Sequence, residues 1–153
     1  MYGTYETIDG RPAVRFERRL PHPADVVWDA ISAPEHLARW FPVDVEPGPE
    51  VASEEAPRER ILRWGEDELR FTLEPEQDGE WTGLVFAHLL GGKEQAAREA
   101  AGWTVCLDRL TDTLEGADVE APGADPTDEW RAHYDEYVRR GFPAGAPVPE
   151  AAS

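Results

Sequence analysis

Histidine and cysteine are the side chains of this sequence best suited to metal binding or nucleophilic chemistry, and they are His22, His36, His88, His133 and Cys106. No two histidines have the HxH, HxxxH or HExxH spacing that brings two imidazoles together on one strand or helix. Cys106 could face His88 as a thiol nucleophile, but no third group is placed to orient the histidine. We therefore favour a small apolar role for Cys106, and the spacing predicts no metal site.

His88 has the clearest structural context of the four histidines. It shares parity with Leu84 and Phe86 on a predicted strand at 81–89, so its side chain should be buried. A buried imidazole needs a hydrogen-bond partner. That partner is either another group of the protein, which we favour, or a bound ligand. The sequence contains no GxSxG, P-loop or dinucleotide fingerprint, and no catalytic residue is predicted.

The tryptophans are many for a chain of this length, and they are Trp28, Trp40, Trp64, Trp81, Trp103 and Trp130. Some stand at the ends of predicted elements, where an indole N–H can meet a polar group of a ligand. An ordinary aromatic core explains Trp28 and Trp130. A core and a ligand cavity explain Trp40, Trp64 and Trp103 equally well.

Charge and composition restrict the partners of this 153-residue chain. Acidic residues outnumber basic ones by 32 to 15, which gives a net charge of −17. This charge repels the phosphates of nucleic acids and of anionic membranes, so both are poor partners. The first ten residues do not resemble a signal peptide, and no apolar stretch approaches the ~18 residues of a membrane span. We expect a cytoplasmic protein, and its single cysteine excludes an intramolecular disulfide.

The hydrophobic pattern predicts an α+β fold. A tight turn at Asp9-Gly10 should join a segment at 2–8 to a strand at 13–20. Arg18 shares parity with the apolar residues of that strand, which we interpret as a bulge or a frayed end. Further elements are two short helices at 24–32 and 35–41, a Pro- and Glu-rich loop at 42–60 with an edge strand at 43–46, and strands at 60–64, 68–74 and 81–89.

The longest periodic segment predicts a helix at 93–115, and its apolar stripe is Ala96, Ala100, Trp103, Leu107, Leu110 and Leu114. A last helix at 127–140 should begin at Thr127 and end before Gly141. We expect residues 1–141 to form a single domain. Residues 142–153, rich in proline and alanine, should be a disordered tail.

Three strings resemble the heat-shock-chaperone ATPase activator-like branch of the START/SRPBCC superfamily. They are Phe16 to Pro23 with Val27-Trp28, Pro34 to Leu37 with Trp40-Phe41-Pro42, and Ala101-Gly102-Trp103 with Cys106-Leu107-Asp108. The resemblance covers roughly residues 2–137 and implies a helix-grip fold, in which a curved antiparallel sheet wraps a long C-terminal helix around an apolar cavity. The stretch at 41–61 is shorter than in relatives, which implies a reduced sheet edge, and Thr104 stands where relatives often have histidine.

The resemblance leaves three classes of function open. The leading hypothesis is binding of a small, largely apolar ligand, lined by Trp40, Trp64, Phe71, Phe86, His88, Trp103, Thr104 and Leu107. The second is a protein-interaction role, such as a chaperone regulator or adaptor, and the third is a cyclase- or hydrolase-type enzyme. We expect no cofactor and no metal, and we expect a homodimer that uses a surface other than the loop at 42–60.

Overall fold

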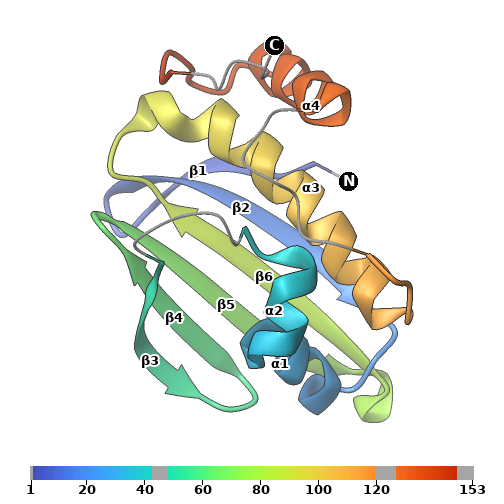
Figure 1. The fold of residues 1–153 in the computed structure, drawn as a ribbon. Helices are drawn as coiled ribbons and strands as arrows, with labels where there is room; N and C mark the ends of the chain where they lie inside the picture. Colours follow the sequence, from blue (N-terminus) through green and yellow to red (C-terminus); the bar gives the residue numbers. More distant parts are fainter. Residues whose placement is uncertain (1, 43–47, 120–126, 148–153) are drawn as a thin grey trace.

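The fold is a six-stranded antiparallel sheet with one face covered by helices, as shown by a computed structural model that describes residues 2–42, 48–119 and 127–147 (Figure 1). The strands follow the order β1-β2-β6-β5-β4-β3 across the sheet. The strands are β1 (Thr4–Ile8), β2 (Arg11–Leu20), β3 (Glu50–Glu55), β4 (Glu59–Trp64), β5 (Asp67–Glu76) and β6 (Trp81–Leu89). The helices are α1 (Ala24–Ser32), α2 (Pro34–Trp40), α3 (Ala96–Leu114) and α4 (Asp128–Arg139), with 3₁₀ turns at Gln77–Gly79 and Lys93–Gln95. The predicted α+β class is confirmed.

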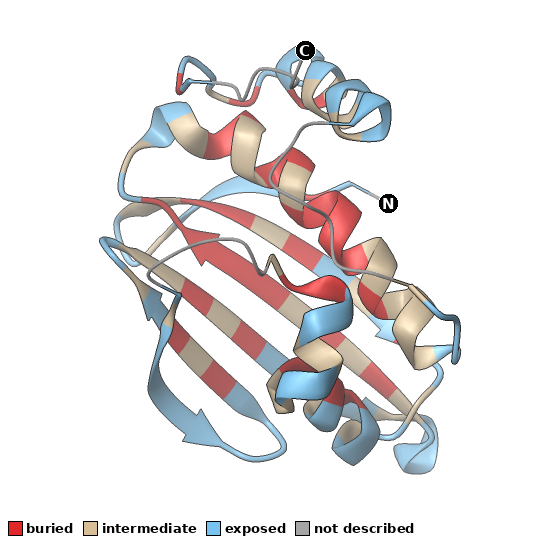
Figure 2. Cartoon of the chain, in the orientation of Figure 1, coloured by how far each residue is buried: buried red, intermediate tan, exposed pale blue. Residues whose placement is uncertain are grey.

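The long helix α3 confirms most of the helix expected at 93–115, and the 3₁₀ turn at Lys93–Gln95 leads into it. Its apolar stripe faces the sheet, and the side chains of Ala96, Ala100, Trp103, Leu107 and Leu110 are all buried. Figure 2 shows the buried band along α3 opposite the buried positions of β2, β5 and β6. The main core therefore lies between the sheet and α3, with α1 and α2 closing the same face. No helix within the described ranges is long and apolar enough to cross a membrane.

The first hairpin has the predicted turn. Asp9 and Gly10 both have positive φ, 51° and 76°, as a two-residue type I′ turn requires. The expected bulge at Arg18 is wrong, because β2 pairs with β6 without a shift in register from Ala13 to Leu20. The Arg18 guanidinium lies 5.6 Å from the centroid of the Phe16 ring. A long side chain can keep its stem on an apolar surface and its charge outside it, so the strand stays regular.

The loop expected at 42–60 contains a strand. β3 pairs with β4 from Glu50 opposite Arg63 to Glu55 opposite Glu59, so β4 is an inner strand and the expected reduction of this edge is wrong. Proline was read as a breaker, but Pro49 and Pro57 lie just outside β3. The residues of β3 are all exposed, and its glutamates are typical of edges that resist pairing with another chain. The strand expected at 43–46 lies outside the described residues.

The helix α4 is tied to α3 and to the N-terminal segment through one hydroxyl group. Tyr137 is buried, and its phenolic oxygen accepts a hydrogen bond from the Gly3 amide at 2.8 Å. The same oxygen lies 2.6 Å from Oγ1 of Thr104, which donates to the Ala100 carbonyl. The predicted N-cap is confirmed, since Oγ1 of Thr127 accepts a hydrogen bond from the Trp130 amide. Burial raises the pKa of Tyr137 despite these bonds.

The segment after α4 differs from the disordered tail expected at 142–153. Phe142 is only 9% exposed, and its ring centroid lies 4.6 Å from that of Tyr137. The Pro143 carbonyl accepts a hydrogen bond from the Ala97 amide, which belongs to the first turn of α3, where amides lack partners within the helix. Residues 142–147 therefore cap and cover the start of α3, and 148–153 lie outside the described residues.

Candidate ligand site between the sheet and the long helix

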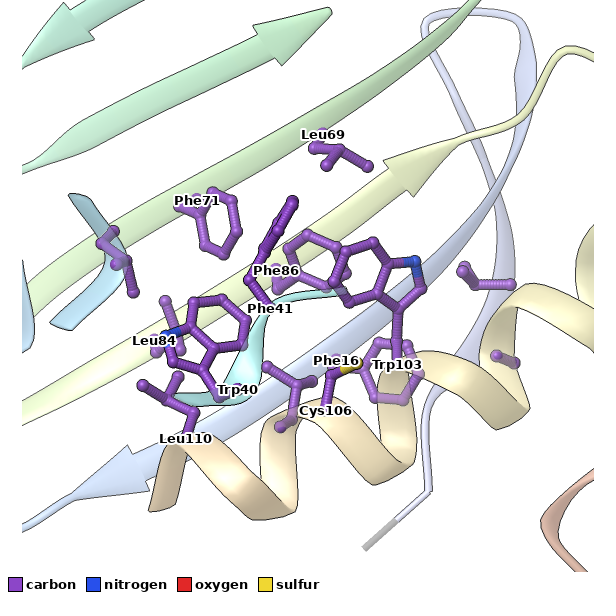
Figure 3. Packing of buried hydrophobic residues seen from close by; sticks show 14 of the residues in the cluster. Phe16, Trp40, Phe41, Leu69, Phe71, Leu84, Phe86, Trp103, Cys106 and Leu110 are labelled. Carbon is purple, nitrogen blue, oxygen red and sulfur yellow. The ribbon is translucent and has the colours of Figure 1, made fainter. Parts of the chain in front are cut away.

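Aromatic side chains from five elements meet between the sheet and α3. This aromatic cluster consists of Trp40, Phe41, Trp64, Phe71, Phe86 and Trp103. Phe71 and Phe86 stand opposite each other on β5 and β6, and their ring centroids are 4.8 Å apart. Trp103 projects from α3 toward Phe86, with the ring centroids 4.5 Å apart (Figure 3). Alternation along the strands and the helical stripe together place these rings.

Phe41 fills the space between two tryptophans. Its ring is stacked on Trp64 at 5.7 Å with an interplanar angle of 19°, and its centroid lies 5.6 Å from that of Trp103. Trp64 is only half-buried and marks the outer side of the cluster, whereas Phe41 is 7% exposed. Sequence reasoning missed Phe41 as a site residue, because it follows a seven-residue helix too short to define an apolar face.

The structure brings together most of the predicted ligand-binding residues. Apart from Trp64 they are all buried. Thr104 stands apart, because its hydroxyl bonds to Ala100 and Tyr137 and so belongs to the contact between α3 and α4.

The indole N–H groups of the inner tryptophans have protein partners. Nε1 of Trp40 donates to the Ala30 carbonyl at 2.8 Å, and Nε1 of Trp103 donates to Nδ1 of His88 at 2.8 Å. These donors hold the two rings in place. A polar group of a ligand would not meet them in this conformation.

His88 lies in a chain of hydrogen bonds at the border of the aromatic cluster. Because Nδ1 accepts from Trp103, the ring proton is on Nε2, which lies 2.6 Å from Oδ2 of Asp67. The other carboxylate oxygen of Asp67 accepts from the Gly91 amide at 2.8 Å. Both ring nitrogens of His88 therefore have protein partners, as the favoured interpretation expected.

Asp67 was missed by the sequence reasoning, because its position next to His88 depends on how two strands pair. Leu69 stands opposite His88 in the pairing of β5 with β6. Asp67 shares the parity of Leu69, so it is the diagonal neighbour of His88 on the same face. The strand was predicted to begin at residue 68, so Asp67 was assigned to the turn before it, whereas β5 begins at Asp67.

Burial acts on the titratable groups of this region in different ways. For Asp67 burial opposes ionisation, but the hydrogen bond from His88, the Gly91 amide and Arg11 outweigh it and lower the pKa. For Cys106 burial raises the pKa of the thiol, so the thiolate needed for nucleophilic attack is disfavoured. Cys106 is a buried core residue near Phe16 (Figure 3), as the apolar interpretation expected.

The lowered pKa of Asp67 predicts a pH-dependent loss of stability. We expect Asp67→Asn to cost about 1.5–3 kcal/mol at neutral pH, since hydrogen bonds to charged groups contribute about this much. The carboxylate stabilises the fold above its unfolded-state pKa of about 3.9, and this contribution is lost as the pH falls through the lower folded-state pKa. Urea unfolding at a series of pH values measures the difference between the two proteins, which should shrink in acid.

The matched control for this comparison is Asp78→Asn, at an exposed position of the turn before β6. It should change stability by less than about 0.5 kcal/mol, as expected for a surface site. A destabilisation by Asp67→Asn that stays constant down to low pH would contradict the assigned role of the carboxylate.

Solved structures of proteins from several bacteria share this architecture. EF2215 of Enterococcus faecalis, a protein of unknown function, is 18% identical with a TM-score of 0.72 over 90% of this chain and 89% of its own. CalU16 of Micromonospora echinospora is 19% identical with a TM-score of 0.68 over 94% and 96%. An AHSA1-like protein of Aeromonas hydrophila is 18% identical with a TM-score of 0.57 over 68% and 92%.

The similarity is one of structure. No family model matches the sequence, and no curated protein matches it. The matching folds are of the SRPBCC type, and two of them align with 90% or more of this chain. The chain therefore has a helix-grip fold like that of these solved structures.

Proposed function

We propose that the protein binds a small, largely apolar molecule between the sheet and α3. The observation that supports this proposal is the aromatic cluster, which joins β4, β5, β6, α2 and α3 and has the polar Asp67–His88–Trp103 chain at its border. Sites for apolar ligands are lined by aromatic side chains with a few placed polar groups. Proteins of the SRPBCC type often bind hydrophobic ligands.

Phe41 occupies the place that we assign to the ligand. Its neighbours Phe71 and Phe86 belong to strands paired on both sides, and Trp103 belongs to a helix of 19 residues. Phe41 follows a helix of seven residues, so its ring is the one that moves at least cost. A planar ligand would then replace its contacts with Trp64 and Trp103. The net charge of −17 favours a neutral ligand over an anionic one.

Native mass spectrometry of the purified chain and titration with a neutral fluorophore test this proposal. We expect a retained small molecule or saturable binding of N-phenylnaphthylamine with one site per chain. Phe41→Ala should bind the probe more tightly, by roughly tenfold, because it leaves an apolar space next to Trp64. Trp64→Ala should bind it more weakly.

Trp81→Ala is the matched control, since Trp81 lies outside the aromatic cluster with Arg19 5.5 Å from its ring. It should leave probe binding unchanged. A wild-type chain with neither a retained molecule nor saturable binding would contradict the proposal. A co-purifying polypeptide in its place would support the protein-interaction hypothesis.

A further inference from the structure

A group of metal-binding side chains lies where α4 packs against α3, away from the sheet. Asp108 comes from α3, and Glu129 and His133 come from α4. Glu129 and His133 are four residues apart, so they lie on the same face of their helix. One ligand atom from each of the three side chains lies within 4.8 Å of the other two. Two helices thus bring an imidazole and two carboxylates to one point.

His133, one of the three side chains, has a ring nitrogen without a partner in the described part of the chain. Its Nδ1 atom is buried and has no hydrogen-bond partner among the described residues. The ring is held by an edge contact with Tyr2, with the centroids 5.6 Å apart. Buried ring nitrogens are normally paired, and one without a partner requires a specific explanation. A bound cation would supply it, since a neutral imidazole is a metal ligand through either nitrogen.

We propose that Asp108, Glu129 and His133 bind a divalent transition-metal ion, with Zn²⁺ as the best match. Zinc accepts histidine nitrogen and carboxylate oxygen, whereas Ca²⁺ and Mg²⁺ prefer oxygen ligands alone. Bonds of about 2.0–2.2 Å allow two ligand atoms on one ion to lie at most about 4.4 Å apart, so small side-chain rotations would close the site. Three protein ligands leave a fourth position for water or a further ligand.

Positively charged side chains near the three ligands compete with a metal ion for the carboxylates. Arg109 forms a loose ion pair with Glu129, since its Nη2 lies 3.8 Å from Oε2, beyond hydrogen-bond length. Arg18 on β2 acts electrostatically on Asp108. Against these two cations stands the net charge of −17, which attracts divalent cations to the protein.

This site is independent of the proposed ligand site on the other side of α3. Histidine spacing predicted no metal, because a search for histidine pairs overlooks a glutamate and a histidine at i and i+4. Because its ligands come from both helices, a bound ion would fasten α4 to α3. An ion that binds the folded chain alone raises the melting temperature with its concentration.

Titration of the chelator-treated full chain with Zn²⁺ by isothermal calorimetry tests the proposal. We expect one ion per chain and a rise in melting temperature on adding Zn²⁺. His133→Gln and Asp108→Asn should each weaken binding by roughly tenfold or more, as expected for the loss of a ligand. Glu129→Gln alters an exposed side chain, so it tests the same site with the least risk to folding.

His36→Gln is the matched control, because His36 on α2 lies outside the metal-binding group. It should bind Zn²⁺ like the wild-type chain. Circular dichroism shows whether each variant is folded. Equal affinity in the wild type, His133→Gln and Glu129→Gln would overturn the proposal, and so would binding to many weak sites without a rise in melting temperature.

Discussion

Replacing Trp103 with alanine should destabilise the protein by about 3–5 kcal/mol, the usual cost of removing a buried aromatic ring. Trp103 is 3% exposed and its ring is in contact with Phe86 and Phe41. The change also removes the donor to Nδ1 of His88, which leaves a buried acceptor unpaired. Urea unfolding followed by far-UV circular dichroism measures the loss independently of tryptophan fluorescence.

Trp103→Phe separates the contribution of ring packing from that of the hydrogen bond to His88. It keeps most of the ring area and removes the N–H donor, so it should cost about 1–3 kcal/mol. Trp81→Ala is the control for loss of an indole that is only partly buried, and it should cost less than Trp103→Ala. Equal losses for Trp81→Ala and Trp103→Ala would show that Trp103 does not hold the sheet and α3 together.

Replacing Phe142 with alanine should cost about 3 kcal/mol, the lower end of the range for buried phenylalanine. Phe142 packs against Tyr137 on α4 and lies 6.1 Å from the Tyr5 ring on β1. The segment that follows it bonds to the first turn of α3 through the Pro143 carbonyl, and to the 3₁₀ turn before α3 through the Ala146 amide, which donates to the Glu94 carbonyl. A chain that ends after Gly141 should therefore lose at least as much stability as Phe142→Ala.

Val138→Ala is the matched control, since Val138 on α4 is 43% exposed, and it should change stability by less than about 0.5 kcal/mol. Thermal unfolding of the variants provides the measurement. Melting temperatures that stay equal in the wild type, Phe142→Ala and the shortened chain would restore the expectation of a disordered tail.

Local features of this protein could be predicted from the sequence. The turn at Asp9-Gly10, the alternation of Leu69, Phe71 and Leu73 on β5, and the stripe on α3 all depend on residues within a few positions of one another. Turn chemistry and periodicity act at this range. Because each element could be predicted locally, their order along the chain was sufficient to predict an antiparallel sheet covered by a long helix.

Features that depend on a distant partner were missed or misread. β3 has no apolar alternation, and it is a strand because β4 pairs with it. Arg18 breaks the pattern of its strand, yet β6 keeps that strand regular. The segment at 142–147 has no apolar face of its own, and its burial depends on the exposed start of α3.

The two candidate sites show the same division between local and long-range information. The sequence alone indicated that His88 is buried, because parity along a strand is local. Its hydrogen-bond partners depend on tertiary structure. The pairing of β5 with β6 brings Asp67, 21 residues away, to His88, and the position of α3 brings Trp103 to it. Likewise the docking of α4 on α3 decided that Asp108 meets His133. Such contacts are set by the packing of whole elements, which periodicity along a single element does not specify.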